Sequence, residues 1–188
     1  MRGRLYVLSG PAGAGKGTVL QTVFSRLDNI SYSVSCTTRA PRPGEVDGVH
    51  YHFMDDVSFR KMVDEGMFLE WADVHGHCYG TRKDTVDRAL DGGSDLILEI
   101  DVQGAANVKS KMPEAVTIFI TPPTFEELVR RLTNRGTESG TELELRIKNA
   151  EYEMDQAAKY QYLIINDTVD RAAEEFIKIV QNYRRGSR

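Results

Sequence analysis

The sequence predicts an α/β fold in which helices flank a central parallel sheet. Short apolar or β-branched runs alternate with segments of helical periodicity, and this order is typical of a parallel sheet covered on both faces. The first run leads directly into a glycine-rich segment that contains a lysine and opens a helix, which is the arrangement of a phosphate-binding P-loop. Two polar segments, 33–82 and 135–149, interrupt the alternation and predict a small insertion and a flap.

The expected strands share an apolar, β-branched composition; they are residues 5–8, 96–100, 116–120 and 162–165. A helix after the first strand is indicated by one apolar face, formed by Val19, Leu20, Val23, Phe24 and Leu27. Thr124 followed by Glu127 reads as a capping box that opens another helix. The last helix is predicted from Val169, Ala172, Ala173, Phe176, Ile177 and Val180, which recur at helical spacing.

Segment 33–82 is rich in Tyr, His, Thr, Gly and Pro, and we expect hairpins and one helix there. Segment 135–149 is polar and contains glycine, as in a flap over a binding site. The chain has no internal repeat or linker-like tract, so the prediction is one domain. Its core consists of residues 1–32, 83–134 and 150–188.

Composition excludes several classes of protein. With 28 acidic and 24 basic residues among 188, the net charge of -4 provides no broad positive surface for nucleic acid or an anionic membrane. Two cysteines cannot form a disulfide framework, and the apolar runs are too short for a signal peptide or a membrane span. We therefore expect a cytoplasmic protein. Composition makes no prediction about its oligomeric state.

The glycine-rich segment is the strongest chemical signal. Nine residues form the expected ATP-binding loop: Gly10, Pro11, Ala12, Gly13, Ala14, Gly15, Lys16, Gly17 and Thr18. Glycines permit the close backbone approach through which N–H groups converge on a phosphate, and Lys16 adds a charge for the β- and γ-phosphates. Gly17 follows the lysine where the motif usually has Ser or Thr, so we expect Thr18 or an ordered water to meet Mg²⁺.

The strand expected at 96–100 ends in acidic residues. A carboxylate at the end of a buried strand is suited to organise a hydrated magnesium ion bound with ATP. Glu99 and Asp101 are both candidates for this role, and Asp101 is the residue we expect to be involved, partly through water.

Several ordered motifs carry a specific resemblance. Residues 33–45 read S-V-S-C-T-T-R-A-P-R-P-G-E, and G-V-H-Y-H-F, F-L-E-W, Y-G-T and D-V-Q-G follow at 48–53, 68–71, 79–81 and 101–104. From about residue 4 to about residue 183 the chain resembles the guanylate kinase family. The resemblance implies Mg²⁺-dependent transfer of a phosphoryl group from ATP to GMP, with dGMP as a further acceptor, giving ADP and GDP. Residues 33–82 would then be the GMP-binding subdomain and 135–149 the lid.

Two arginines suit an acceptor phosphate. Arg39 and Arg42 lie three apart in a proline-interrupted loop, and guanidinium forks match a phosphate that carries close to two negative charges. Tyr51 offers a hydroxyl. The resemblance implies that Arg39, Arg42, Tyr51 and Tyr79 hold the GMP phosphate.

The guanine base needs acceptors rather than cations. Guanine presents two adjacent donors, N1–H and N2–H₂, and one carboxylate can accept both. The resemblance implies that Glu70 has this role, that Ser35 and Thr81 supply hydroxyl contacts, and that Asp101 also belongs to the GMP site.

An acceptor phosphate is already ionised and needs no general base, so catalysis should consist of positioning and charge neutralisation. The catalytic residues expected on this basis are Lys16, Arg39, Arg135 and Arg146. The two last-named match family arginines of the lid, and Arg131 is a further candidate about one turn before Arg135. The resemblance places Asn166 and Asp167 on the adenine side.

Alternative functions are a kinase for another nucleoside monophosphate and a non-enzymatic guanylate-kinase-like module that binds phosphorylated protein. The intact loop with Lys16 favours the enzyme over the module, and Arg39, Arg42 and Glu70 favour GMP. The histidine pairs 50/52 and 75/77 suggest zinc at first sight. Alternate residues of a hairpin share one face in any case, and this is the interpretation we prefer.

Overall fold

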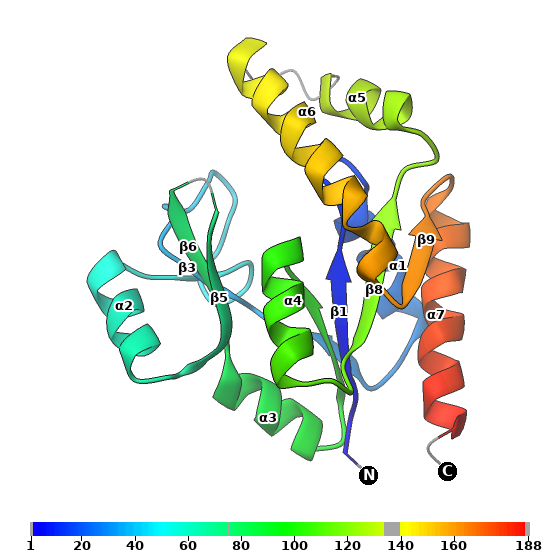
Figure 1. Ribbon diagram of the computed structural model, residues 1–188. Coiled ribbons are helices and arrows are strands. Elements are labelled where there is room, and N and C mark those ends of the chain that lie inside the picture. Colours follow the sequence, from blue (N-terminus) through cyan, green and yellow to red (C-terminus); the bar gives the residue numbers. More distant parts are fainter. Residues whose placement is uncertain (1, 75, 134–139, 187–188) are drawn as a thin grey trace. The chain divides into compact units, whose positions relative to one another are not determined.

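The computed structural model describes residues 2–74, 76–133 and 140–186 (Figure 1). Its strands are β1 (Leu5–Ser9), β2 (Ile30–Tyr32), β3 (Cys36–Thr37), β4 (His52–Phe53), β5 (Phe68–Val74), β6 (His77–Arg82), β7 (Asp95–Glu99), β8 (Val116–Thr121) and β9 (Tyr162–Ile165). Its helices are α1 (Lys16–Arg26), α2 (Asp56–Asp64), α3 (Lys83–Asp91), α4 (Val102–Lys111), α5 (Phe125–Thr133), α6 (Gly140–Asp155) and α7 (Val169–Gly186), with a 3₁₀ turn η1 at Ala157–Lys159.

The strands form two sheets. The larger has five strands in the order β2-β7-β1-β8-β9, and the smaller has four in the order β4-β3-β6-β5. β2 pairs parallel with β7, and β8 pairs parallel with β9. The predicted α/β class with a central parallel sheet and flanking helices is confirmed.

The chain divides into two compact units. The first comprises residues 1–7 and 29–116, and the second comprises residues 8–28 and 117–188. β1 belongs to both, since its last two residues lie in the second unit.

The first unit contains the smaller sheet, which is mixed. β5 and β6 form an antiparallel hairpin, β3 is antiparallel to β6, and β4 is parallel to β3. Helix α2 packs beside this sheet, where Phe59 stacks on Phe68 with ring centroids 4.6 Å apart (Figure 1). Asp55 caps α2 by accepting a hydrogen bond from the Ser58 N–H. This part of the first unit is the hairpin-and-helix insertion expected for residues 33–82.

The second unit is built on helix packing and fully buried β8. α1 contacts α7, and α5 contacts α6 (Figure 1). The apolar face expected on α1 is confirmed at Val19, Leu20 and Val23. The Thr124 hydroxyl accepts from the Glu127 N–H as an N-cap, whereas the Glu127 carboxylate binds Arg130 and Arg131 instead of closing a capping box.

Two details differ from the expected pattern. In α7 the buried face includes Ile179, whereas Ile177 is half-buried. Phe176 and Val180 point toward the core, and at helical spacing residue 179 lies on the same face as they do. In β9, Leu163 and Ile165 are about half exposed while Ile164 is buried. β9 ends the sheet order, so its side chains alternate between core and surface like those of an edge strand.

Within the described residues, none of the helices combines the length and the apolar character that a membrane crossing requires.

Candidate functional site

The phosphate loop between β1 and α1 depends on glycine at two positions. Gly10 has φ +149°, and a Cβ there would lie 2.1 Å from the Ile120 carbonyl oxygen. Gly15 has φ +83°, and its Cβ would lie 2.5 Å from Asn166 Nδ2. A side chain at either position would strain the backbone and displace a neighbour. The loop can therefore take this course only with the glycines that the motif predicted.

Lys16 is the first residue of α1, where helix N–H groups and the helix dipole favour an anion. Its ammonium donates to the carbonyl oxygens of Gly10, at 2.6 Å, and Pro11, at 3.3 Å. The lysine thus folds back over its own loop. Loop amides and this ammonium are chemically suited to receive phosphate oxygens.

A cavity of about 380 Å³ adjoins the loop within the second unit. It is lined by Gly13, Gly15, Thr18, Arg131, Asn166, Asp167 and Val169. Its volume falls in the range of small-molecule sites, about 300–1,000 Å³.

Asn166 and Arg131 tie the wall of this cavity to the loop. Buried Asn166 donates from Nδ2 to the Ala14 carbonyl at 2.7 Å, so the residue after β9 braces the phosphate loop. Arg131 donates to Glu127 at 2.7 Å and to the Asn166 carbonyl at 3.2 Å. These bonds place Arg131 at the loop cavity.

In the first unit, Arg39 stands among aromatic rings and one carboxylate. Its guanidinium lies 5.5 Å from the ring centre of Tyr51 and 5.8 Å from that of Phe53. The Tyr51 and Tyr79 rings meet edge to face at 5.9 Å. Three residues predicted to hold an acceptor phosphate, Arg39, Tyr51 and Tyr79, therefore lie together.

Glu45 fixes the orientation of Arg39. Its two carboxylate oxygens accept from the two terminal nitrogens of Arg39 at 2.8 and 2.9 Å, and one of them also accepts from the Arg42 N–H at 2.7 Å. The bond to Arg39 lowers the pKa of Glu45 to about 2, and the Arg42 N–H adds to the effect. The carboxylate is thus ionised at any physiological pH and holds the arginine fork in a defined position.

Glu70 on β5 is a buried carboxyl group, with 4% of its surface exposed. The Thr81 hydroxyl on β6 donates to Glu70 Oε1 at 2.6 Å. Burial raises the pKa of Glu70 to about 7, and the charge of Asp101 adds to the rise, while the Thr81 bond and the Lys111 charge oppose it. Near neutral pH the group is therefore close to the point where it ionises, and any ligand that donates hydrogen bonds to it will favour the carboxylate.

Asp101 is the N-cap of α4 and accepts from the Gly104 N–H at 2.6 Å. Ser35 is buried, and its carbonyl accepts from the His52 N–H at 2.8 Å. Burial, followed by the charge of Glu99, raises the pKa of Tyr32 above its usual value, so that phenol stays protonated. The charge of Asp101 acts on Glu70, and Tyr51 likewise interacts with Tyr32.

The predicted site residues divide between the two units. The first unit holds Ser35, Arg39, Arg42, Tyr51, Glu70, Tyr79, Thr81 and Asp101, and the second holds the loop from Gly10 to Thr18 together with Arg146. Arg146 is half-buried on α6. Arg135 lies outside the described residues.

The residues that support the site are not evident from the sequence. Glu45 ends the motif at 33–45 and has no predicted role there, although an acid six residues after an arginine in one loop is a usable signal. Asn166, which the resemblance places on the adenine side, also donates a hydrogen bond to the loop carbonyl of Ala14. The sequence predicts no role for Ser33 either; its hydroxyl is buried and has no hydrogen-bond partner in the described part of the chain.

Comparison with known proteins gives a consistent result. A family model for guanylate kinases matches residues 2–183. The guanylate kinase of Caldanaerobacter subterraneus subsp. tengcongensis is 49% identical over 179 residues, which are 95% of this chain and 87% of that protein. The guanylate kinase of Thermus thermophilus is 48% identical over 187 residues, 100% of this chain and 84% of that protein.

A solved structure agrees with these relatives. The crystal structure of guanylate kinase from Anaplasma phagocytophilum matches with a TM-score of 0.81 and 33% sequence identity, covering 97% of this chain and 86% of that one.

Proposed function

The chain belongs to the guanylate kinase family, and we propose on this premise that it transfers the γ-phosphoryl group of ATP to GMP, giving ADP and GDP. The observation that carries the proposal is the buried Glu70 carboxyl, bonded to Thr81, in the unit that also holds the Arg39 cluster. A carboxylate for the base and an arginine for the phosphate are the two receptors that GMP requires.

Guanine recognition follows from the hydrogen-bond inventory. Glu70 accepts from guanine N1–H and N2–H₂, with Thr81 fixing one carboxylate oxygen, and Ser35 and Asp101 complete the base site. Adenine has an acceptor in place of the N1–H and no amino group at C2, so AMP bound in the same pose would leave the buried carboxylate without either donor. Such a mismatch costs roughly 10⁴-fold in selectivity in sites built around polar contacts.

Acceptor phosphate binding follows from charge. Arg39, held by Glu45, presents its remaining N–H groups to the GMP phosphate, and Arg42, Tyr51 and Tyr79 contribute further donors. Because Glu45 keeps the fork oriented before GMP arrives, less side-chain entropy is lost on binding. GMP and dGMP differ at the ribose and share these contacts, so both serve as acceptors.

ATP binds at the phosphate loop. Backbone N–H groups of the loop and the N-terminus of α1 receive the phosphates, and Lys16 exchanges its loop carbonyls for β- and γ-phosphate oxygens. The adjoining cavity, with Asn166 and Asp167 in its wall, accommodates the nucleoside side of ATP.

The residues present suit Mg²⁺ carried with ATP. Magnesium prefers oxygen ligands and usually keeps several waters, bound by one or two protein groups and the substrate phosphates. Thr18 offers an exposed hydroxyl, Asp101 offers a carboxylate, and within the described residues no group of three or more His, Cys, Asp or Glu forms a protein metal cage. When bound, the ion neutralises charge on the phosphates.

The chain's own residues position the reactants and neutralise charge. The acceptor phosphate oxygen attacks without a general base, because it is already ionised. Lys16 and Arg39 hold the two phosphate groups, and Arg146 together with Arg135 supplies positive charge from the lid. Free thiols at Cys36 and Cys78 fit a reducing compartment, the cytoplasm.

A coupled assay of ADP formation tests the proposal, with ATP and Mg²⁺ and with GMP, dGMP or AMP as acceptor. We expect turnover with GMP and dGMP, and AMP at least about 10³-fold lower in kcat/KM. Turnover with AMP alone would overturn the assignment. Binding of GMP without any turnover would instead favour the non-enzymatic module.

A further inference from the structure

Strand β5 carries a bulge immediately before Glu70. Phe68 pairs with Arg82 and Glu70 pairs with Thr81, although Phe68 and Glu70 are two positions apart on β5 and their partners are adjacent on β6. Leu69 is therefore the extra residue of the bulge. A bulge leaves its extra residue outside the regular ladder and re-aims the next side chain. The direction in which Glu70 points therefore depends on how the Leu69 backbone is held.

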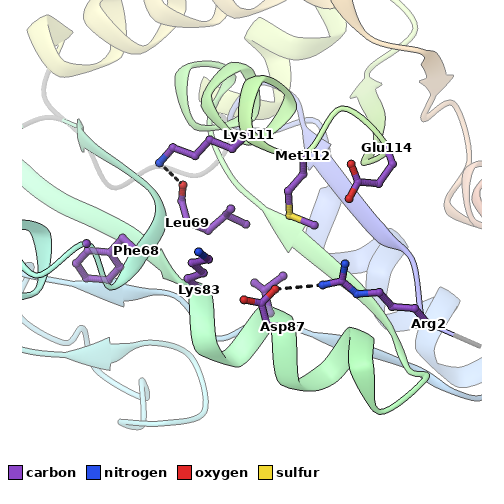
Figure 2. Close-up of a pocket in the computed structure, with 10 residues that line it drawn as sticks. Arg2, Phe68, Leu69, Lys83, Asp87, Lys111, Met112 and Glu114 are labelled. Atoms are coloured by element: carbon purple, nitrogen blue, oxygen red, sulfur yellow. Dashed lines mark hydrogen bonds and ion pairs between the residues drawn. The ribbon is translucent and has the colours of Figure 1, made fainter.

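Lys111, at the end of α4, binds that backbone. Its ammonium donates to the Leu69 carbonyl at 2.5 Å, and Figure 2 shows the side chain reaching from the helix to the strand. A charged donor makes this bond stronger than a bond between neutral groups. The carbonyl of the bulge residue is thus satisfied by a side chain from another element.

The same helix also shapes the space around the Glu70 carboxyl group. A Cβ at Gly104 would lie 2.7 Å from Glu70 Oε2, so α4 approaches the carboxyl as closely as a glycine allows. Gly104 and Lys111 are seven residues apart, which is two turns along one face of the helix. One face of α4 therefore contacts β5 at two points, the carboxyl of Glu70 and the carbonyl just before it.

We propose that Lys111 is a positioning residue for Glu70, holding the β5 bulge so that the carboxyl group is presented to its ligand. The proposal rests on the proposed function, in which Glu70 accepts the guanine donors. Lys111 itself touches no substrate in this scheme. It acts through the Leu69 backbone and through its charge.

The charges around Glu70 agree with this role. Asp101, the N-cap of α4, raises the pKa of Glu70, and Lys111 lowers it. Removing the ammonium would leave Asp101 unopposed by this lysine and raise the pKa of Glu70 further. The ionised form that accepts guanine would then appear only at higher pH.

The surroundings of Lys111 make a variant practical. The residue is exposed, and with Leu69 it lines a cavity of about 580 Å³ that opens to solvent (Figure 2). In a Lys111→Met variant, water from this cavity can replace the ammonium at the Leu69 carbonyl. We therefore expect the protein to fold.

Lys109 provides a matched control on the same helix. Its ammonium also donates to backbone carbonyls, those of Pro113 at 2.6 Å and Ala115 at 2.8 Å. These carbonyls belong to the segment after α4 and not to β5. Lys109→Met removes the same charge and the same kind of bond without touching the bulge.

The test compares steady-state kinetics across pH for wild type, Lys111→Met, Lys111→Arg and Lys109→Met. For Lys111→Met we expect the KM for GMP to rise about tenfold with kcat within about twofold. The acid limb of the kcat/KM profile for GMP should move up by about 0.5 pH unit. Lys111→Arg should bring the KM for GMP and the acid limb of the profile most of the way back to the wild-type values. Lys109→Met should resemble wild type in both quantities.

A substrate-free readout separates this proposal from the proposed function. The Glu70 carboxyl can be followed by ¹³C NMR titration in labelled protein, with Glu70→Gln identifying its signal. A higher pKa in Lys111→Met than in Lys109→Met supports the positioning role even if GMP is not the acceptor. Equal titration curves, together with equal KM values for GMP in the two variants, would overturn it.

Discussion

The two units hold the charges that we propose bind phosphate in opposite ways. In the second unit, Lys16 lies across its own loop on backbone carbonyls, and the loop conformation is set by glycines. In the first unit, Arg39 is oriented by the carboxylate of Glu45, and Glu70 is set by burial, Thr81 and α4. One receptor is made by the main chain and the other by pairs of side chains.

This difference teaches which features a sequence can reveal. A backbone receptor needs glycines at fixed spacing, so its motif is visible in one short run of residues. A side-chain receptor needs partners from separate elements, and its energetics depend on burial that only the fold creates. Mutations in the second unit should accordingly change turnover and ATP binding, and mutations in the first unit should change the KM and kcat/KM for GMP.

The largest effect is expected at the main-chain receptor. Lys16→Met removes the charge that moves onto the ATP phosphates, and kcat should fall at least about 10³-fold. GMP binding should remain measurable by calorimetry. Lys83→Met is a matched control, because Lys83 is likewise the first residue of a helix, α3, and lies outside the loop.

If the Lys16 variant lost GMP binding along with turnover, the two receptors would not be independent. That result would contradict the distinction between a main-chain receptor for ATP and a side-chain receptor for GMP.

The next largest effect is expected for Glu70→Gln. The amide keeps an acceptor for Thr81 but presents a donor where guanine also presents one, so kcat/KM for GMP should fall by roughly 10²- to 10³-fold. The KM for ATP should stay within about twofold of wild type. If kinetic efficiency fell equally for GMP and for ATP, the result would argue against a role of Glu70 specific to the guanine base.

The same variant should gain stability. The pKa of Glu70 in the folded protein, about 7, is above its usual value of 4.5. The stability contributed by the protonated carboxyl is therefore complete below pH 4.5 and is lost as the pH rises through 7. At pH 8 the free energy of unfolding of Glu70→Gln should exceed that of wild type by on the order of 3 kcal/mol.

Urea unfolding at pH 8 and at pH 5 measures this difference. The gain should be present at pH 8 and should shrink toward zero at pH 5. A variant less stable than wild type at pH 8 would contradict the assignment of a buried carboxylate with a raised pKa.

A smaller effect is expected for Glu45→Gln. Without the carboxylate, Arg39 loses its bidentate partner and samples other orientations, so the KM for GMP should rise about tenfold with little change in the KM for ATP. Asp84→Asn is the matched control: Asp84 also holds an arginine, Arg82, through two bonds, at 2.7 and 3.0 Å, outside the site. Similar KM values for GMP in the two variants would show that Glu45 is not a positioning group.

The particular residues show where sequence reasoning succeeded. Glycine spacing and Lys16 predicted the loop, and apolar runs predicted β1, β7, β8 and β9 to within a residue or two. β2 was not predicted, because three residues of mixed burial give no periodicity. The α/β class followed from the order of apolar runs and helical patterns alone, since strands that alternate with helices along the chain are typical of a parallel sheet covered on both faces.

The candidate site was less accessible to the same reasoning. Glu70 beside Trp71 looks like an ordinary surface acid in the sequence, and its burial appears only when β5, β6 and α4 come together. The bulge at Leu69 and the reach of Lys111 likewise depend on strand register and helix placement, which no local pattern encodes.

Calorimetric titration of the Lys16→Met and Glu70→Gln proteins, each with GMP and separately with a non-hydrolysable ATP analogue, tests most directly whether each unit holds its own nucleotide. We predict that Lys16→Met weakens binding of the ATP analogue and leaves the Kd for GMP within about threefold of wild type. Glu70→Gln should instead weaken binding of GMP and leave the Kd for the ATP analogue within about threefold of wild type. Loss of both nucleotides in either protein, or the opposite pattern of losses, would contradict the account.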